Sequence, residues 1–372
     1  ITIQFSELAH QNLINQNFYW YILMKNIFFF LGALLPTTIL FADGERAVDH
    51  APIGVMGDHF HKKGESMISL RHIKMYMAGN LIGNKDVSDG QIIELPNPYQ
   101  MGNMPPKLSV VPQNMEMDMT MLGMMYAPSD SITIMGMGMF MGKEMKLNTY
   151  KGMMDRTLLG TFNSSSFDLS DFSVSALIKL RKTENSRWHA QLGIQKSVGK
   201  ENTSGEVLTP MNTTQSIILP YGMQSGDKST ALFSALTYVT TRENWVFGGQ
   251  LRMKSNISED KWHFGNSLSP TGWLQRELSS KTSVSLRLTY RHQYPINGRN
   301  NVIMAPVQTA NPNNYGGKTI ELGTGLNQLF KIFPGDHADR FGIEVSYPIY
   351  QNLNGPQMKS GLSIQLGYQK SF

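Results

Sequence analysis

Residues 114–145 carry the most regular pattern of apolar and polar positions in the chain. Two runs alternate in character with a period of two, which predicts extended strands because successive side chains of a strand point to opposite faces. The runs are joined by residues 127–130, Ala-Pro-Ser-Asp, a tight-turn sequence. The pattern therefore predicts a β-hairpin, since a helix would mix the two sets of positions.

The two faces of this hairpin differ in composition. In the first run, one face holds Met115, Met117, Met119 and Met121, and the other holds Glu116, Asp118 and Thr120. In the second run, Thr133, Met135, Met137, Met139, Met141 and Lys143 lie opposite Ile132, Ile134 and Phe140. One face is apolar without interruption, so the pattern predicts lipid or a core on that side and a wetter environment on the other.

The same alternation recurs to the end of the chain. Further strands are predicted at residues 65–77, 172–181, 188–195, 229–240, 245–254, 268–278, 284–291, 320–327, 341–347 and 362–369. The short connections are expected at 127–130, 182–187, 241–244, 279–282 and 333–339, and the long ones at 78–114, 146–167, 198–227, 257–266, 295–316 and 350–359. An even number of strands, about twelve, with alternating short and long connections is typical of an outer-membrane barrel.

We therefore predict an all-β fold: a transmembrane, antiparallel, up-and-down β-barrel of about twelve strands in a bacterial outer membrane. A soluble β-sandwich would also show alternation. It would not explain the loop asymmetry, an N-terminal export signal and the aromatic residue Phe372 at the end of an alternating strand together. Trp188, Trp245, Phe341 and Phe372 fall beside predicted short turns, at one membrane interface.

The N-terminal region divides into three expected segments. Residues 1–23 are expected to be an upstream extension, and residues 24–42, with Lys25 before an apolar run, resemble a secretory signal peptide. A membrane anchor over residues 18–40 is the alternative, but Lys25 and Asn26 interrupt it. Residues 43–64 are expected to form a periplasmic or plug-like segment before the barrel, residues 65–372.

Composition excludes several classes of protein. The chain has no cysteine, which excludes disulfides, thiolate catalysis and cysteine-based zinc sites. Its net charge is +5, but the basic residues are scattered, so no nucleic-acid partner is expected. Apart from the signal-like region, no apolar run approaches the ~18 residues of a membrane-spanning helix.

Lipid offers no hydrogen bonds, so the polar set of each strand is expected to face the lumen. The predicted lumen-lining residues are Glu116, Asp118, Lys179, Arg252, Lys254, Arg287, Arg291, Glu321 and Glu344. Opposite charges in a confined lumen tend to pair. A barrel of about twelve strands is also narrower than a porin, so a partly occluded pore is expected.

Methionine and histidine are the candidate metal ligands. Thioether sulfur selects Cu(I), but the parity of Met115, Met117, Met119 and Met121 places them toward lipid. Met135, Met137, Met139 and Met141 are expected in the lumen beside Asp118, either as a soft-metal or flexible apolar site or as plain packing. His50, His59 and His61 are candidates for a metal site, with a solvated periplasmic segment as the alternative. Copper is the one cofactor considered; otherwise none is expected.

Catalysis and assembly complete the sequence-based expectations. A barrel phospholipase would need a Ser/His pair at the lipid edge, and His189 and His292 have no partners readable from spacing, so no enzyme is expected.

Phe372, with apolar residues at alternate preceding positions, resembles the C-terminal signal read by the barrel-assembly machinery, although Lys370 departs from that pattern. Outer-membrane lipid and a small-molecule solute are the other expected partners.

Residues 50–65, HAPIGVMGDHFHKKGE, and the Met-Tyr-Ala-Pro-Ser-Asp sequence at 125–130 carry a family resemblance. Together with the barrel pattern, they resemble bacterial outer-membrane transporter-like proteins related to the meta-pathway phenol-degradation family. The resemblance implies an outer-membrane barrel. Three functions remain open: a channel or transporter for small, hydrophobic solutes; a Met/His-rich copper-binding or copper-export barrel; and a structural barrel with a closed lumen.

Overall fold

The computed structural model describes residues 46–372 except 103, 154 and 333–336. These residues all belong to one compact unit. The expected upstream extension (1–23), the signal peptide (24–42) and the alternative anchor lie outside the described residues. Within the described part of the chain, no helix is both long and apolar enough to cross a membrane.

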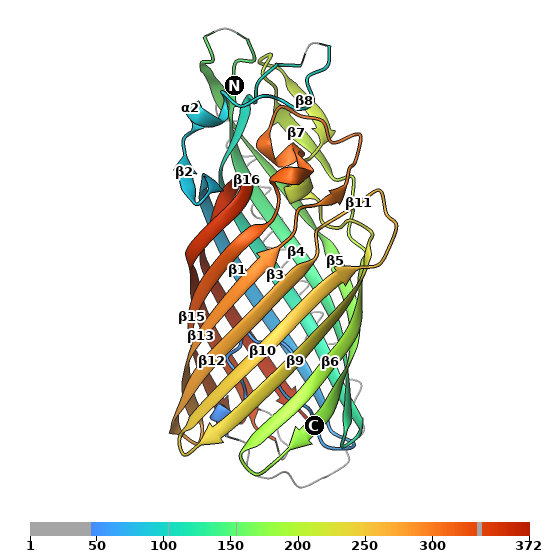
Figure 1. The fold of residues 1–372 in the computed structure, drawn as a ribbon, viewed down its shortest axis with the longest axis vertical. Coiled ribbons are helices and arrows are strands. Elements are labelled where there is room, and N and C mark those ends of the chain that lie inside the picture. The colour runs from blue at the N-terminus through green and yellow to red at the C-terminus, as the bar shows by residue number, and fades with distance from the viewer. Residues whose placement is uncertain (1–45, 103, 154, 333–336) are drawn as a thin grey trace. The chain divides into compact units, whose positions relative to one another are not determined.

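The described strands form a closed antiparallel barrel (Figure 1). The ring consists of β1 (Ser66–Gly83), β3 (Val110–Ser129), β4 (Ile132–Tyr150), β5 (Leu158–Lys182), β6 (Ser186–Ser197), β9 (Thr230–Arg242), β10 (Trp245–Asn256), β12 (Ser267–Ser279), β13 (Thr282–Gln293), β15 (Gly317–Phe330) and β16 (Asp339–Ser371). Each strand pairs with its neighbour in this order, and β16 pairs with β1 to close the ring. The all-β barrel predicted from the alternation is confirmed.

The long element β16 supplies two passes through the barrel wall. Its first arm pairs with β15 from Asp339 to Leu353, and its second arm pairs with β1 from Leu353 to Ser371. The Gln351 side chain, which donates to the Ser360 carbonyl oxygen over 2.9 Å, joins the two arms. A closed ring in which every neighbouring pair is antiparallel needs an even number of passes. The reversal within β16 makes the number even.

Short turns and long loops occupy opposite ends of the barrel. Turns of a few residues join β3 to β4, β5 to β6, β9 to β10 and β12 to β13, as expected. The long loops at the other end contain β2 (Lys85–Val87), α2 (Asp89–Ile92), β7 (Ser204–Leu208), β8 (Thr214–Ile218), η2 (Tyr221–Met223), β11 (Trp262–His263), β14 (Asn297–Gly298), η3 (Gln308–Ala310) and η4 (Pro312–Asn314). The expected long loop at 146–167 is wrong: β4 and β5 extend into it and leave only residues 151–157.

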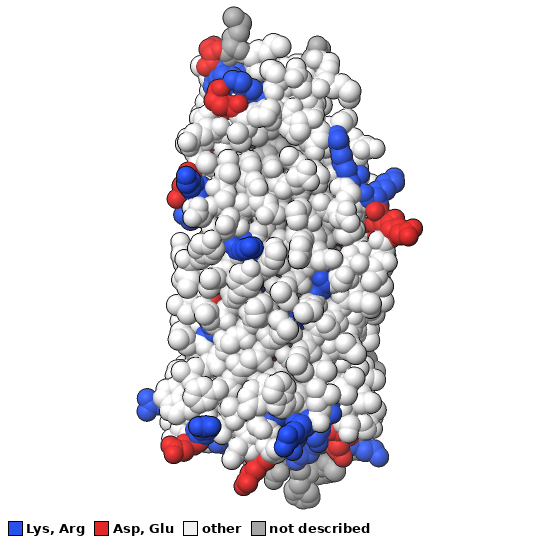
Figure 2. All heavy atoms as spheres, in the orientation of Figure 1, with Lys and Arg blue, Asp and Glu red and all other residues white. Residues whose placement is uncertain are grey.

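The outer surface is apolar around the middle of the barrel. Leu192, Leu236, Phe247, Leu286 and Leu288 are exposed on it, between 42% and 56%. Figure 2 shows, on one face, charged side chains gathered at the two ends with few between them. An apolar girdle between charged ends is the surface of a barrel that spans a lipid bilayer.

A hydrophobic cluster closes the long-loop end. Its buried core includes Tyr221, Trp262, Ile303 and Val307 from the loops and Met145 from β4. The Tyr221 and Trp262 rings meet edge to face with centroids 4.8 Å apart. These loops fold back over the barrel mouth and bury their own apolar side chains there.

Residues 46–64, which we call the plug, lie inside the barrel at the short-turn end. The plug begins with η1 (Ala47–Asp49), where the Ala47 amide donates to the Ser280 carbonyl oxygen in the β12–β13 turn. It ends at Gly64, whose amide donates to the Ala127 carbonyl oxygen near the β3–β4 turn. The plug therefore crosses the lumen from one wall to another.

Candidate functional site: the plugged barrel interior

A cavity of about 520 Å³, which we call the inner cavity, lies between the plug and the loop cluster. Seven methionines line it: Met77, Met115, Met117, Met139, Met141, Met145 and Met358. Lys143, Asp171, Lys254 and Arg291 contribute charges to its wall. Methionine is flexible and polarisable and fits ligands of varied shape, so this lining suits apolar solutes.

A second cavity of about 300 Å³, the loop pocket, lies among the long loops. Its lining is largely apolar and includes Phe162, Val207, Met211 and Val307. Met145 lines both the loop pocket and the inner cavity. The two spaces therefore adjoin at this buried side chain.

The structure reverses the expected orientation of β3. Met115 and Met121, expected to face lipid, are buried at 7% and 8% exposure, and Met115 and Met117 line the inner cavity. Glu116 and Asp118, expected in the lumen, lie on the outer face. There Lys74 Nζ of β1 lies 2.8 Å from a Glu116 carboxylate oxygen and 3.6 Å from one of Asp118.

The length of β3 explains this correction. A strand of 20 residues that rises about 3.3 Å per residue and tilts about 40° stands roughly 50 Å tall, whereas the apolar band is about 25 Å high. Asp118 lies roughly 30 Å above the short turn, so the rule that polar residues face inward does not apply to it. Outside the bilayer, charged residues can face outward, and the thioethers can line the lumen.

The other predicted lumen residues face inward. Arg291 lies on the wall of the inner cavity with Lys254, Glu321 lines a neighbouring cavity of about 270 Å³, and Arg287 and Glu344 are buried at 7% and 2% exposure. The Lys179 ammonium lies 5.4 Å from the centroid of the Phe60 ring in the plug. The Arg252 guanidinium lies 4.8 Å from the centroid of the buried Phe233 ring.

Side chains of the barrel wall hold the plug by its backbone carbonyl groups. Arg71 Nη1 donates to the carbonyl oxygens of Ile53 and Val55 over 2.6 and 3.0 Å. Similar bonds run from Gln365 to Ile53, Gln275 to His50, Gln250 to Met56, Arg340 to Ala51 and Arg187 to Asp49. Sequence reasoning missed this role, although the recurring Gln at inner positions was a usable signal.

The plug fits the wall closely at Gly54. Its amide donates to Glu344 over 3.4 Å. A Cβ atom at Gly54 would lie 2.4 Å from a Glu344 carboxylate oxygen and 2.8 Å from Arg287 Nε. A larger residue would therefore push the plug away from this ion pair.

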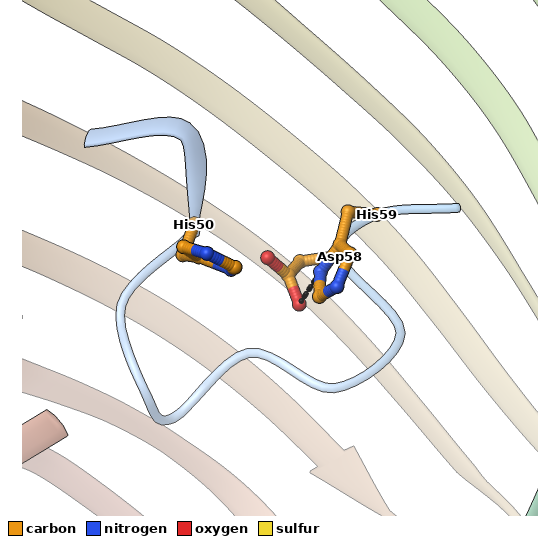
Figure 3. Close-up of side chains that lie close together, drawn as sticks. All are labelled: His50, Asp58 and His59. Atoms are coloured by element: carbon orange, nitrogen blue, oxygen red, sulfur yellow. Dashed lines mark ion pairs between the residues drawn. The ribbon is translucent and has the colours of Figure 1, made fainter. Parts of the chain in front are cut away.

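The expected histidines lie in the plug, and Figure 3 shows two of them, His50 and His59, on either side of Asp58. Single ligand atoms of His50, Asp58 and His59 all lie within 4.8 Å of one another. The His59 ring centroid is 5.1 Å from that of His50 and 5.0 Å from that of His61. Sequence reasoning selected the three histidines and the nearby Asp58 from their residue types, and the structure brings His50, Asp58 and His59 together into a group that could hold a metal ion.

Asp58 is the electrostatic centre of the plug. Its carboxylate accepts a hydrogen bond from the Ala51 amide at 2.9 Å and lies 3.0 Å from His59 Nδ1. Burial alone would raise the pKa of Asp58, but its contact with His59 and the charge of Arg340 outweigh burial and hold the pKa well below its usual range. Asp58 is therefore an anion that fixes both ends of the loop drawn in Figure 3.

The luminal methionines of β4 divide between two cavities. Met139 and Met141 line the inner cavity. Met135 and Met137 line a small cavity of about 20 Å³ beside Asp58 and His59, which we call the plug cavity. They face the lumen as expected, but their acidic neighbour is Asp58 of the plug and not Asp118.

No family model matches the sequence, and no curated protein matches it. Among solved structures, the fold is similar to that of an outer-membrane channel from Pseudomonas putida F1, with a TM-score of 0.54 and 12% identity over 86% of this chain and 100% of that one. A Pseudomonas aeruginosa FadL homologue gives 0.41 and 8% over 89% and 99%. A TodX deletion mutant, a monoaromatic hydrocarbon channel, gives 0.42 and 8% over 84% and 91%.

The first of these similarities establishes a shared fold and nothing about the solute. Together with the closed ring and the apolar girdle, it identifies the chain as a bacterial outer-membrane β-barrel protein. In such barrels the short turns face the periplasm. We therefore refer to the short-turn end as the periplasmic end and to the long-loop end as the extracellular end.

Proposed function

We propose that this protein is an outer-membrane channel for small hydrophobic solutes. A solute enters the loop pocket and passes Met145 into the inner cavity. It leaves at the periplasmic end when the plug is displaced. The observation that carries this proposal is that two cavities, of about 300 and about 520 Å³, share the flexible Met145 side chain in their linings. Cavities of this size hold drug-sized or smaller ligands.

The lining favours apolar over polar solutes. A polar solute would lose hydrogen bonds to water on entering the loop pocket, whose lining is largely apolar, and would regain few of them there. Thioether sulfur also makes favourable contacts with aromatic rings. We propose monocyclic aromatic solutes as the first class to test, which agrees with the sequence resemblance to the meta-pathway phenol-degradation family.

The decisive experiment measures solute entry when the path is narrowed or widened. Met145→Trp should block passage, and Met145→Ala should raise the uptake rate of an apolar aromatic solute into vesicles containing the refolded protein. Met124→Trp is the matched control, because Met124 is 63% exposed on the outer face of the neighbouring strand.

Three results would contradict the proposal. A polar solute of the same size that enters as fast as the aromatic one would exclude selection by the apolar lining. Equal uptake by Met145→Trp and the unsubstituted protein would exclude this path. No uptake of any solute by well-folded protein would favour the structural barrel with a closed lumen.

We further propose that the barrel-assembly machinery recognises the second arm of β16 through Phe372. This residue pairs with Ser66 through two backbone hydrogen bonds and is 38% exposed. Phe372→Ala should reduce the amount of folded barrel in cells and leave refolding from denaturant in vitro largely unchanged. An equal loss in both assays would indicate a purely structural role for the ring.

A further inference from the structure

The plug cavity differs from the two larger cavities in size and lining. It has a volume of about 20 Å³ and lies between the plug and the wall strands β1, β3 and β4. A space of this size holds one water-sized occupant. It excludes an organic solute, so it plays no part in holding the cargo proposed above.

Two kinds of metal-ligating side chain meet at this cavity. Asp58 and His59 line it from the plug, and Met67, Met121, Met125, Met135 and Met137 line it from the barrel wall. Most side chains in this group are buried, with Asp58 at 2% and Met125 at 4% exposure. Thioethers from three adjacent strands thus face the loop that carries the histidines.

His59 is held in the orientation that a ligand requires. Its Nδ1 faces the Asp58 carboxylate at 3.0 Å. Both ring nitrogens are buried, and neither makes a hydrogen bond of good geometry to a described residue. A carboxylate close to one nitrogen of an imidazole favours a proton on that nitrogen and a lone pair on the other, which is the form that binds a metal ion.

We propose that His50, Asp58 and His59, together with the methionines of the plug cavity, form a binding site for a single Cu(I) ion. Imidazole ligands suit zinc, copper, iron and nickel, whereas thioethers select Cu(I), so copper is the metal that both ligand types accept. The chain has no cysteine that could supply a thiolate instead. Calcium and magnesium need sets of oxygen ligands that this site lacks.

The site joins the plug to the wall. His50, Asp58 and His59 belong to the plug, and Met135 and Met137 to β4. An ion bound by both sets would oppose displacement of the plug. Metal binding is independent of the proposed channel function, whereas its effect on solute passage rests on that function.

The test uses the full chain refolded in vesicles and titrated with Cu(I) under reducing conditions against a chromophoric Cu(I) chelator. We expect one equivalent to bind more tightly than Zn²⁺. His59→Gln and the double variant Met135→Leu/Met137→Leu should each weaken binding by about tenfold or more. Met124→Leu, on the outer face of β3, is the matched control and should bind as the unsubstituted protein does.

Exchange of Met for Leu nearly preserves volume, so the double variant should fold, as heat-modifiable migration on gels can verify. Absence of Cu(I) binding, tighter binding of Zn²⁺, or unchanged Cu(I) affinity in the double variant would each overturn the assignment. If the protein binds Cu(I) but transports no solute, the metal site stands and the channel proposal is rejected. The two proposals therefore fail separately.

Discussion

Arg287 Nη2 lies 2.6 Å from a carboxylate oxygen of Glu344, and this buried pair connects the barrel wall to the plug at Gly54. Glu321 lies 2.7 Å from the same nitrogen but is more exposed, at 27% of its side chain. The pair joins β13 to the first arm of β16 across β15. Because Glu344 is buried and Glu321 is partly exposed, we expect the two carboxylates to contribute differently to stability.

Arg287→Met should lower the free energy of unfolding by about 3–5 kcal/mol, because it leaves the buried Glu344 carboxylate without its cation. Glu321→Gln should lower the free energy of unfolding by only about 0–1 kcal/mol, because Arg287 remains paired with Glu344. Urea unfolding of the refolded barrel measures both. Equal effects of the two substitutions would show that burial does not determine the strength of this network.

Arg71→Met should loosen the plug, because two hydrogen bonds from a charged donor to Ile53 and Val55 are lost. Each such bond contributes about 1.5–3 kcal/mol. Single-channel conductance should rise, and amides of residues 46–64 should exchange faster. Leu70→Ala, on the lipid side of the same strand, serves as the control. A plug that exchanges at the same rate in both variants would refute this role of Arg71.

Leu192→Arg should impair insertion into bilayers more than Gln195→Arg does. Leu192 is 56% exposed on the outer face of β6, where an arginine near the bilayer midplane costs about 2–4 kcal/mol. Gln195 lines the inner cavity, where the added charge can be hydrated. Folding yield as a function of denaturant in vesicles distinguishes the two, and a similar loss for both would mean that the faces of β6 are reversed.

Glu65, just before β1, should make the end of the plug sensitive to acid. Burial alone would raise its pKa, but the contact with His61 at 3.4 Å and the hydrogen bond from the Lys62 amide at 2.9 Å lower it below the ordinary value. Because the folded-state pKa is the lower one, the stabilisation is complete above the unfolded pKa of about 4.3 and is lost as pH falls through the folded-state value.

Hydrogen exchange of residues 60–65 should therefore accelerate below a pH of about 4, beyond the intrinsic effect of pH. Glu65→Gln should remove that dependence and weaken this end of the plug at neutral pH. The same acid response in Glu65→Gln would assign it to another group.

The fold was predictable because period-two alternation is imposed by the bilayer. Runs such as residues 284–291 and 341–347 have lipid on one side, so apolar positions mark the outer face directly. The signal fails where a strand leaves the bilayer. The first half of β5, with Asn163, Ser164, Ser165 and Ser166, has no apolar face and was expected to be a loop.

The site was predictable in its residues but not in its arrangement. His50, His59 and the methionines of β4 could be selected from ligand chemistry alone. Their meeting depends on the plug folding into the lumen, a non-local event for which strand periodicity carries no information. The orientation of Met115 and Met117 was wrong for a related reason: alternation separates two faces, and only the height of the strand in the membrane decides which one is inside.

One carbonyl group has a consequence for the order in which the barrel assembles. The Ile53 oxygen accepts hydrogen bonds from Arg71 on β1 and from Gln365 on the second arm of β16, the two strands whose pairing closes the ring. If the ring closed first, the plug would have to thread into a finished cylinder to place this oxygen between the two donors. We infer that the plug acts as a template for the seam. A chain lacking residues 46–64 should then refold to the heat-modifiable form more slowly than the complete chain.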